Sequence, residues 1–492
     1  MLANLLGRGA SLFLNLATLP LYLELAGPEA VGLIGLNIIV FSLFSLLDLG
    51  LPTTLNRNLA ALSAKGMRKA MATNLRTFEY VFWSVSLVIL MVGYTVADYL
   101  SLKWLKSIDL ERDVVFLSMA FLMISAAVRF SISLYQAALY GLNSQVQVNL
   151  IIVVSALLRL VLPLIWIYLY EGGIVVFFIV QAGVYFLELC YSAAKVWSIV
   201  GWSQTRSKFD KNTLLRSFNF SLGVTGISVT AAILSQVDRV VLSNVLSLTE
   251  FGYYSIAISV SSGLISIAYP LANAAFPHLT GYLATKDIEG ARSSFLFFFR
   301  VLIALIFPIV VTMVFFSKEI MELYVSESAK FVWPLTRVMV VGAFFSCLTA
   351  LPHVFLLAKG NWRPALMINC ACTPLYIIAI LIASEHGALT VAYCYSIYHL
   401  VYFLALSLLA IEKHNEIFGN LMFPELRKLA YPFLICAGVA FLIDQIGLYQ
   451  YGETGAFGLI LLFFSFNLVL LPLLKKDYRC LLKSLLSRSH RT

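Results

Sequence analysis

The sequence predicts an all-α polytopic membrane protein. Of its 492 residues, 61% are hydrophobic and only 12% are charged, whereas soluble domains carry roughly 25% charged residues. So much apolar surface requires lipid as the solvent for most of the chain. The apolar runs reach about 20 residues, the length of a spanning helix. A β-barrel would instead show short strands that alternate apolar and polar residues.

The apolar runs divide the chain into fourteen expected spanning helices. They cover residues 3–25, 31–54, 77–97, 114–134, 149–170, 174–198, 217–238, 252–275, 294–316, 331–357, 365–384, 388–411, 429–447 and 456–474.

The basic residues of the loops predict the orientation of these helices. With the N-terminus inside, the inner loops and tail hold 22 Lys and Arg residues and the outer loops hold six. Because cytoplasmic loops are enriched in Lys and Arg, both termini are expected in the cytoplasm. The net charge of +9 is therefore attributed to these loops, and no nucleic-acid partner is expected.

Landmarks recur along the chain at a nearly constant offset of 219–221 residues. The pairs are Gly32 and Gly252, Lys65 and Lys286, Gly141 and Gly360, and Asn149 and Asn369. Parallel repeats of this kind are common in secondary transporters, which bind substrate between the halves. The domains predicted from the repeat are an N-terminal six-helix bundle (1–198), a cytoplasmic linker (199–216), a C-terminal six-helix bundle (217–411), an additional helix pair (412–474) and a basic tail (475–492), with the two bundles around a central cavity.

Motifs of soluble enzymes are missing from the sequence. It contains no GxxxxGK[ST] loop, no strand-borne GxGxxG and no HExxH, and no loop is long enough to fold as a catalytic domain. The seven cysteines lie almost entirely within apolar runs and are interpreted as packing residues. We therefore expect no enzymatic activity, no metal and no cofactor, and transport would draw on an ion or substrate gradient.

Polar residues form stripes on several of the expected helices. On the first helix, Arg8, Ser11, Asn15, Thr18 and Tyr22 are spaced by three and four residues, which places them on one face. Similar stripes occur on helices 2, 7 and 8, the equivalent positions of the two halves. They favour a hydrated cavity, although small polar residues also join helices to each other in lipid.

Charged residues within the expected helices are mainly basic. A charge near the bilayer centre costs roughly 2.5–3.5 kcal/mol on insertion scales and normally faces a cavity or a partner. Arginine binds phosphate oxygens in a bidentate manner, so the excess of arginine indicates an anionic cargo. Arg8 and Arg337 lie near helix ends and could instead extend to the interface.

From these patterns we select two sets of candidate site residues. The expected substrate-binding residues are Arg8, Asn15, Arg129, Arg159 and Arg337. The carboxylates that could couple transport to an ion are Asp48, Glu188 and Asp238.

Several short motifs resemble a known family. Leu47-Asp48-Leu49-Gly50 followed by Arg57, and Gln236-x-Asp238-Arg239 followed by Phe251-Gly252-Tyr253-Tyr254, are similar to segments of the polysaccharide transporters of the MOP exporter superfamily, the Wzx-type O-antigen flippases. Gly141-Leu142-Asn143 before Asn149 is similar to that family's short loop after helix 4. The resemblance covers roughly residues 1–410.

The resemblance implies a lipid-linked oligosaccharide flippase of the bacterial cytoplasmic (inner) membrane. Its cargo would be a polyprenyl-pyrophosphate-linked unit of O-antigen, lipopolysaccharide or a similar surface polysaccharide, moved by alternating access and coupled to H+ or Na+. Its partners would be this lipid-linked oligosaccharide, membrane lipids, a polysaccharide polymerase and a chain-length regulator. Two alternatives stay open: a multidrug or cation antiporter of the same superfamily, and a membrane glycosyltransferase or polysaccharide polymerase.

Overall fold

The computed structural model describes residues 2–170, 172–201, 208–360, 363–413 and 430–446, with short pieces at 424, 427–428, 460–461 and 463–467. Throughout these residues the regular structure is helical, apart from one isolated bridge between Lys106 and Ser247. The chain packs as two compact units, residues 1–256 and 257–492, and each is described by itself.

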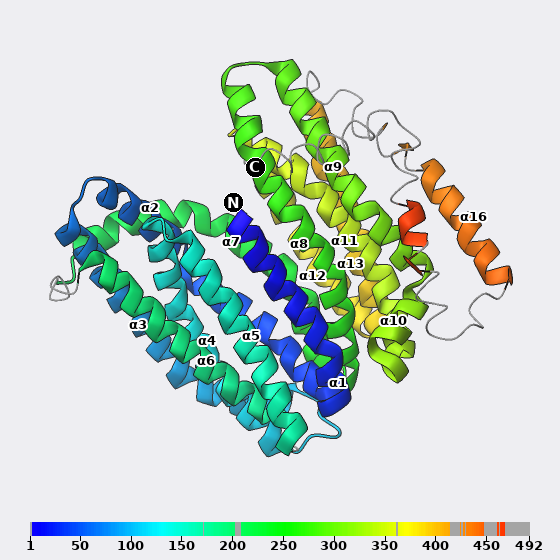
Figure 1. Ribbon diagram of the computed structural model, residues 1–492, viewed down its shortest axis with the longest axis horizontal. Coiled ribbons are helices and arrows are strands. Elements are labelled where there is room, and N and C mark those ends of the chain that lie inside the picture. The colour runs from blue at the N-terminus through cyan, green and yellow to red at the C-terminus, as the bar shows by residue number, and fades with distance from the viewer. Residues whose placement is uncertain are drawn as a thin grey trace. The chain divides into compact units, whose positions relative to one another are not determined.

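The first unit is a bundle of long helices. It contains α1 (Leu2–Ser45), η1 (Leu46–Asp48), α2 (Leu51–Ala64), α3 (Arg68–Tyr99), η2 (Leu100–Trp104), α4 (Arg112–Gly141), α5 (Gln145–Tyr170), α6 (Val175–Val200), α7 (Lys211–Val245) and the start of α8 (Leu248–Ala284). Helix α4 is central because it packs against both α3 and α6 (Figure 1).

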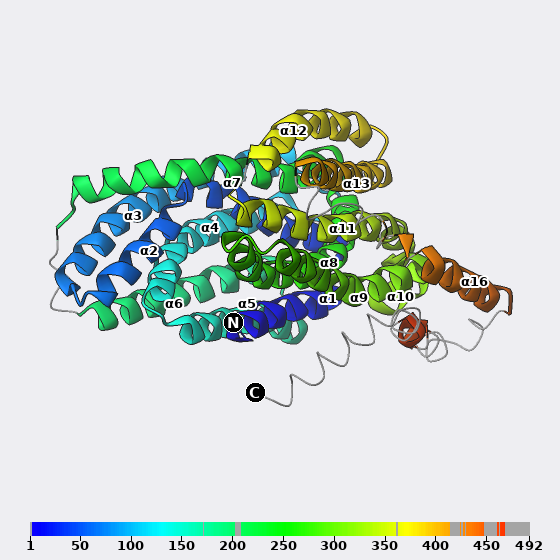
Figure 2. The same ribbon diagram turned by 90° about the horizontal axis from the view of Figure 1, so that it is seen from above.

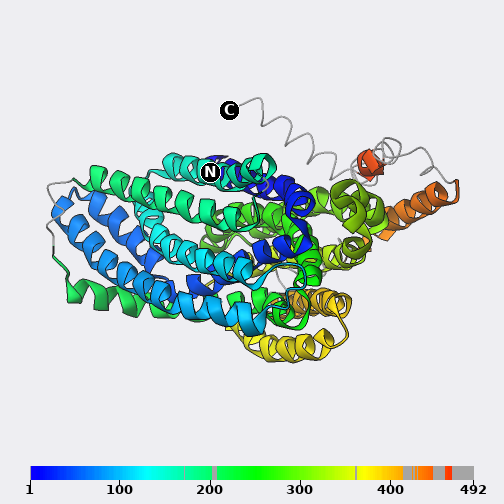
Figure 3. The ribbon, with the colours of Figure 1, turned by 90° about the horizontal axis from the view of Figure 1, so that it is seen from below.

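The second unit contains the rest of α8 and the helices that follow it. They are α9 (Ile288–Phe315), α10 (Ser317–Val325), η4 (Ser326–Ser328), α11 (Ala329–Ala358), α12 (Arg363–Ser384), α13 (Ala388–Lys413) and α16 (Ala430–Ile446). Helices α12 and α13 run side by side at one edge of this unit (Figures 2 and 3). The predicted domain division, with its linker at 199–216, stays a prediction.

The predicted class, an all-α polytopic membrane protein, is confirmed, but the count of fourteen spans is not. Among the described residues, ten helices are long and apolar enough to cross a membrane. One of them, Phe13–Asp48, covers the first two expected spans, because α1 runs through both. Helix α7 forms as predicted, but the side chains of residues 216–232 lie outside the described residues, as does most of the expected span at 456–474.

Gly27 separates the two segments of α1. Its φ of 83° lies in the left-handed region that glycine adopts without strain, and Pro28 follows it. The second segment ends in a tight turn in which the Gly50 N–H donates to Asp48 Oδ1 at 2.8 Å. The helix after this turn, α2, was missed in the sequence because its buried residues Leu51, Leu55 and Leu59 form only a narrow apolar face.

Two pairs of residues that are equivalent in the predicted repeat make a reciprocal contact between α1 and the start of α8. A β-carbon added at Gly32 would lie 2.6 Å from the Leu248 carbonyl oxygen, and one at Gly252 would lie even closer to the Pro28 carbonyl oxygen. Gly32 and Gly252 are 220 positions apart, and so are Pro28 and Leu248. Equivalent residues of the two halves therefore approach each other symmetrically.

A buried carboxylate beside this contact holds the α3–α4 loop. Glu29 is 2% exposed. It accepts hydrogen bonds from the backbone N–H groups of Ile108 at 2.6 Å, Asp109 at 3.2 Å and Leu110 at 2.9 Å, and from the Ser107 hydroxyl at 2.8 Å. Because leaving such donors unpaired is costly, Glu29 fixes the loop against the bend in α1.

The close contact at Gly252 predicts a position-specific cost of adding a methyl group. Gly252→Ala should lower the free energy of unfolding by about 1–3 kcal/mol, because α1 and α8 must separate. Thermal unfolding of the purified protein in detergent measures this change. Gly281→Ala is the matched control on the same helix, since nothing lies within 4 Å of the added carbon. It should be neutral or slightly stabilising, and equal effects at both positions would contradict the contact.

Candidate functional site

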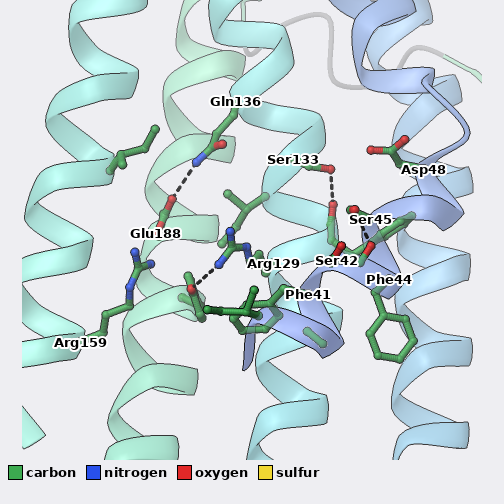
Figure 4. Close-up of a pocket in the computed structure, with 16 residues that line it drawn as sticks. Phe41, Ser42, Phe44, Ser45, Asp48, Arg129, Ser133, Gln136, Arg159 and Glu188 are labelled. Carbon is green, nitrogen blue, oxygen red and sulfur yellow. Dashed lines mark hydrogen bonds between the residues drawn. The ribbon is translucent and has the colours of Figure 1, made fainter. Parts of the chain in front are cut away.

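The first unit contains a cavity of about 530 Å³ formed by four of its helices (Figure 4). Its lining residues recur at intervals of about three and four along α1 and α4, so each set falls on one helix face. The lining residues are Ile38, Phe41, Ser42, Phe44, Ser45 and Asp48 from α1 and η1; Ala126, Arg129, Phe130, Ile132, Ser133 and Gln136 from α4; Ile152 and Arg159 from α5; and Tyr185 and Glu188 from α6. The volume is in the range of ordinary ligand pockets.

Two aromatic rings hold Arg129 at the cavity wall. Its Nη1 donates to the Tyr185 hydroxyl at 2.9 Å, and its guanidinium carbon lies 4.5 Å from the centre of the Phe41 ring. The side chain stays accessible from the cavity. Neutral groups thus fix Arg129 without a carboxylate partner among the side chains that the structure describes.

The same tyrosine also holds Arg159. The Arg159 guanidinium carbon lies 4.7 Å from the centre of the Tyr185 ring, and its Nη1 donates a long hydrogen bond of 3.4 Å to the Ser155 hydroxyl. Tyr185 itself is 3% exposed. Its hydroxyl is therefore used by one arginine and its ring face by the other, each cation–π contact contributing about 0.5–2 kcal/mol.

The carboxylate of Glu188 is occupied by neutral donors. Glu188 is buried and accepts hydrogen bonds from Gln136 Nε2 at 3.0 Å and from the Ser155 hydroxyl. Within the described part of the chain, neither cavity arginine lies within 4.0 Å of a carboxylate oxygen. The two guanidinium groups are therefore available to an anionic ligand.

A second arginine site on the same bundle shows the opposite arrangement. Arg76 lies 2.7 Å from Glu79, which also accepts hydrogen bonds from Tyr135 and Trp197, both at 2.8 Å. Glu79 is 4% exposed. This network joins α3, α4 and α6 through the buried Glu79 and neutralises its arginine, in contrast to the cavity.

The structure brings four of the predicted site residues to this cavity: Arg129, Arg159, Asp48 and Glu188. Asn15 is exposed and donates to the Ser11 carbonyl oxygen at 2.8 Å. Arg337 is exposed on α11 of the second unit. Where these side chains lie does not test their predicted roles in substrate binding or ion coupling.

Two other predicted residues lie elsewhere or are not described. Asp238 is buried in the first unit, where the Tyr254 hydroxyl donates to it at 2.5 Å, and it does not line the cavity. The Arg8 side chain and those of the predicted stripe on α7 (Ser221, Thr225, Ser228 and Ala232) lie outside the described residues.

Sequence reasoning missed the aromatic side chains that hold the arginines. Tyr185 and Phe41 lie in strongly apolar runs, where aromatic residues are expected for packing alone. The available signal was the position of Tyr185 three residues before Glu188, which places both on one face of α6.

Comparison with known families supplies the identity that the geometry leaves open. The family model described as "Polysaccharide biosynthesis protein" matches residues 1–283, more than half of the chain. The chain belongs to this family. A second model, MatE, matches residues 225–382.

Individual relatives agree with the family assignment. The "Putative O-antigen transporter" of Shigella flexneri is 21% identical over 404 residues, which cover 80% of this chain and 93% of that protein. The inward closed structure of the lipid II flippase MurJ has a TM-score of 0.73 at 14% identity and covers 97% of this chain and 98% of that one. An inward-facing multidrug resistance MATE family transporter of the MOP superfamily has a TM-score of 0.66 at 12% identity and covers 82% and 94%.

The predicted membership of the polysaccharide transporter branch of the MOP superfamily is therefore confirmed. This family member is a multi-pass membrane protein and a transporter rather than an enzyme.

The shared contact of Tyr185 with both arginines predicts graded effects on stability. Tyr185→Phe removes only the hydroxyl acceptor and should lower the free energy of unfolding by about 1 kcal/mol. Tyr185→Leu also removes the ring and should lower it by about 2–4 kcal/mol. Tyr191→Leu on the exposed side of α6 is the control and should change it by less than about 0.5 kcal/mol.

A double-mutant cycle isolates the interaction with Arg129. In an Arg129→Gln background, Tyr185→Phe should cost less than in the wild type, because the hydroxyl has lost its charged donor. Identical costs in both backgrounds, measured by thermal unfolding in detergent, would show that the hydrogen bond contributes nothing.

Proposed function

We propose that this protein is a flippase that moves a polyprenyl-pyrophosphate-linked oligosaccharide, an O-antigen or similar surface-polysaccharide unit, across the cytoplasmic membrane. The observation that carries the proposal is the pair Arg129 and Arg159, which line one cavity without a carboxylate partner among the described residues. A diphosphate is the ligand whose charge and oxygen atoms complement two guanidinium groups.

The comparisons support the same class of cargo. The Shigella flexneri relative bears the name of an O-antigen transporter, and the family model is that of polysaccharide biosynthesis. The fold is that of a lipid II flippase. These likenesses favour a lipid-linked saccharide over a free anion, and the polyprenyl chain would remain in the bilayer while the polar head enters the cavity.

The proposal also includes the ion that drives transport, the side of the membrane on which the termini lie, and the partner proteins. Transport proceeds by alternating access and is coupled to H+ or Na+ through Asp48, Glu188 or Asp238, while Arg8, Asn15 and Arg337 make additional contacts with the cargo. Both termini lie in the cytoplasm, as the distribution of Lys and Arg favours. A polysaccharide polymerase and a chain-length regulator receive the flipped product.

The arginine pair provides the test. Arg129→Ala combined with Arg159→Ala should reduce flipping of a lipid-linked oligosaccharide in proteoliposomes by roughly 100-fold, because two charge-assisted contacts with the cargo are lost. Replacement of both by Lys should retain part of the activity, since the charge remains but the planar fork does not.

The control for this double variant is Arg112→Ala. Arg112 is exposed and pairs with Asp98 at 3.0 Å away from the cavity, so flipping should be unchanged. Wild-type rates in the double alanine variant, with normal folding, would refute the proposed function.

The match of residues 225–382 to the MatE model favours one second candidate, a multidrug antiporter. A cationic drug would need unpaired acidic groups, and Asp48 is one such group at the described cavity, but Arg129 and Arg159 in the same lining would repel the drug. Expression in a drug-sensitive strain should therefore leave resistance to cationic compounds unchanged. Increased resistance that Asp48→Asn abolishes would favour the antiporter.

A further inference from the structure

The two ends of the cavity differ in chemistry. Figure 4 shows Arg159 at one side, Arg129 in the middle, and Asp48 with Ser45 and Ser133 at the other side. One end presents guanidinium groups beside Glu188, whose carboxylate is occupied by Gln136 and Ser155. The other end presents the Asp48 carboxylate and hydroxyl groups. A ligand with one kind of polar group would match only half of this surface.

The two ends also lie at different depths in the bundle. Arg129 is 12 residues before the end of α4 at Gly141, which corresponds to roughly 18 Å along the helix. Asp48 lies in the turn between α1 and α2, and the β-carbon position of Gly141 is 2.5 Å from the Asn56 carbonyl oxygen of α2. Asp48 thus lies nearer than Arg129 to the end of the bundle where α4 finishes.

The Asp48 end has unused hydrogen-bonding capacity. Asp48 Oδ1 accepts from the Gly50 N–H, whereas Oδ2 and the Ser42 hydroxyl have no partner among the described residues. The hydroxyls of Ser45 and Ser133 donate to the carbonyl oxygens three residues earlier, both at 2.7 Å, so their own oxygens can still accept. This end therefore offers mainly acceptors, which suit a ligand rich in O–H or N–H donors.

Aromatic rings accompany these acceptors. Phe41 and Phe44 from α1 and Phe130 from α4 line the same cavity. A sugar ring has hydroxyl donors on its edge and C–H groups on its faces, and it can satisfy carboxylate and aromatic groups together. A second phosphate, by contrast, would be repelled by the Asp48 carboxylate.

We infer that Asp48 and Ser42 form a sugar-recognising subsite that reads the saccharide nearest the diphosphate, while Arg129 and Arg159 hold the diphosphate itself. This inference rests on the proposed function and adds a specificity-determining role for the Asp48 end. Asp48 accepts from the first sugar, and the arginine pair fixes the depth at which that sugar lies.

Probes with and without a sugar distinguish the two subsites. The full-length protein in nanodiscs is titrated with geranyl diphosphate and with geranyl diphosphate carrying one hexose or one N-acetylhexosamine. The wild type should bind at least one glycosylated probe more tightly than the sugar-free probe. Asp48→Asn should weaken binding of that glycosylated probe roughly ten-fold and leave the sugar-free probe unchanged.

The choice of variants keeps folding intact. The amide oxygen of an asparagine can still accept from the Gly50 N–H, and Ser42→Ala, a second variant, should give a smaller loss in the same direction. Asp113→Asn, an exposed position on α4 that does not line the cavity, is the control and should change neither probe.

The outcomes distinguish the inference from the proposed function. If Arg129→Ala weakens both probes but Asp48→Asn weakens neither or both equally, the subsite is refuted and the flippase proposal survives. A change only in the H+ or Na+ dependence of flipping would assign Asp48 to coupling and also overturn the subsite. If Arg129→Ala affects no probe, the diphosphate site itself is wrong.

Discussion

Two like charges share one membrane cavity in this protein, and neutral groups keep them there. A guanidinium group inside a bilayer normally requires a counter-charge, yet a carboxylate partner would occupy the donors that a ligand needs. Tyr185 resolves this conflict, because its hydroxyl accepts from Arg129 and its ring faces Arg159. The arrangement depends on α4, α5 and α6 being held in register around a single buried phenol.

The arginine on α3 has the carboxylate partner that the two cavity arginines lack among the described residues. Arg76 is paired with Glu79, and that carboxylate is further engaged by Tyr135 and Trp197. Such a network is stable because every partner is satisfied, but it has little left to offer an anion. Glu188 lines the same cavity as the two arginines, but it accepts hydrogen bonds from Gln136 and Ser155 instead. The same bundle thus contains a structural arginine and two that are available for binding.

The sequence predicted best those features that depend on one helix alone. The length and apolar character of the runs were sufficient to predict the fold class, and the excess of arginine within the expected helices selected Arg129 and Arg159, both of which line the cavity. Side-chain contacts between different helices could not be predicted from the spacing of residues along one helix. Nothing local indicates that Tyr185 would contact arginines from two other helices, or that Glu29 would bind the loop at 107–110. The amphipathic α2 was not predicted from the apolar runs because only one narrow face of it is buried.

The reciprocal approach of Gly32 to Leu248 and of Gly252 to Pro28 restricts two positions of the chain at once. In an isologous interface, residue i of one subunit meets residue j of the other, and j meets i. The contact in this single chain follows that rule at an offset of 220 residues, and it extends to Thr249, whose hydroxyl lies 3.5 Å from Glu29. The same close approach is therefore made twice within one chain. Gly32 and Gly252 must both lack a side chain, because a β-carbon at either position would press against a backbone carbonyl oxygen.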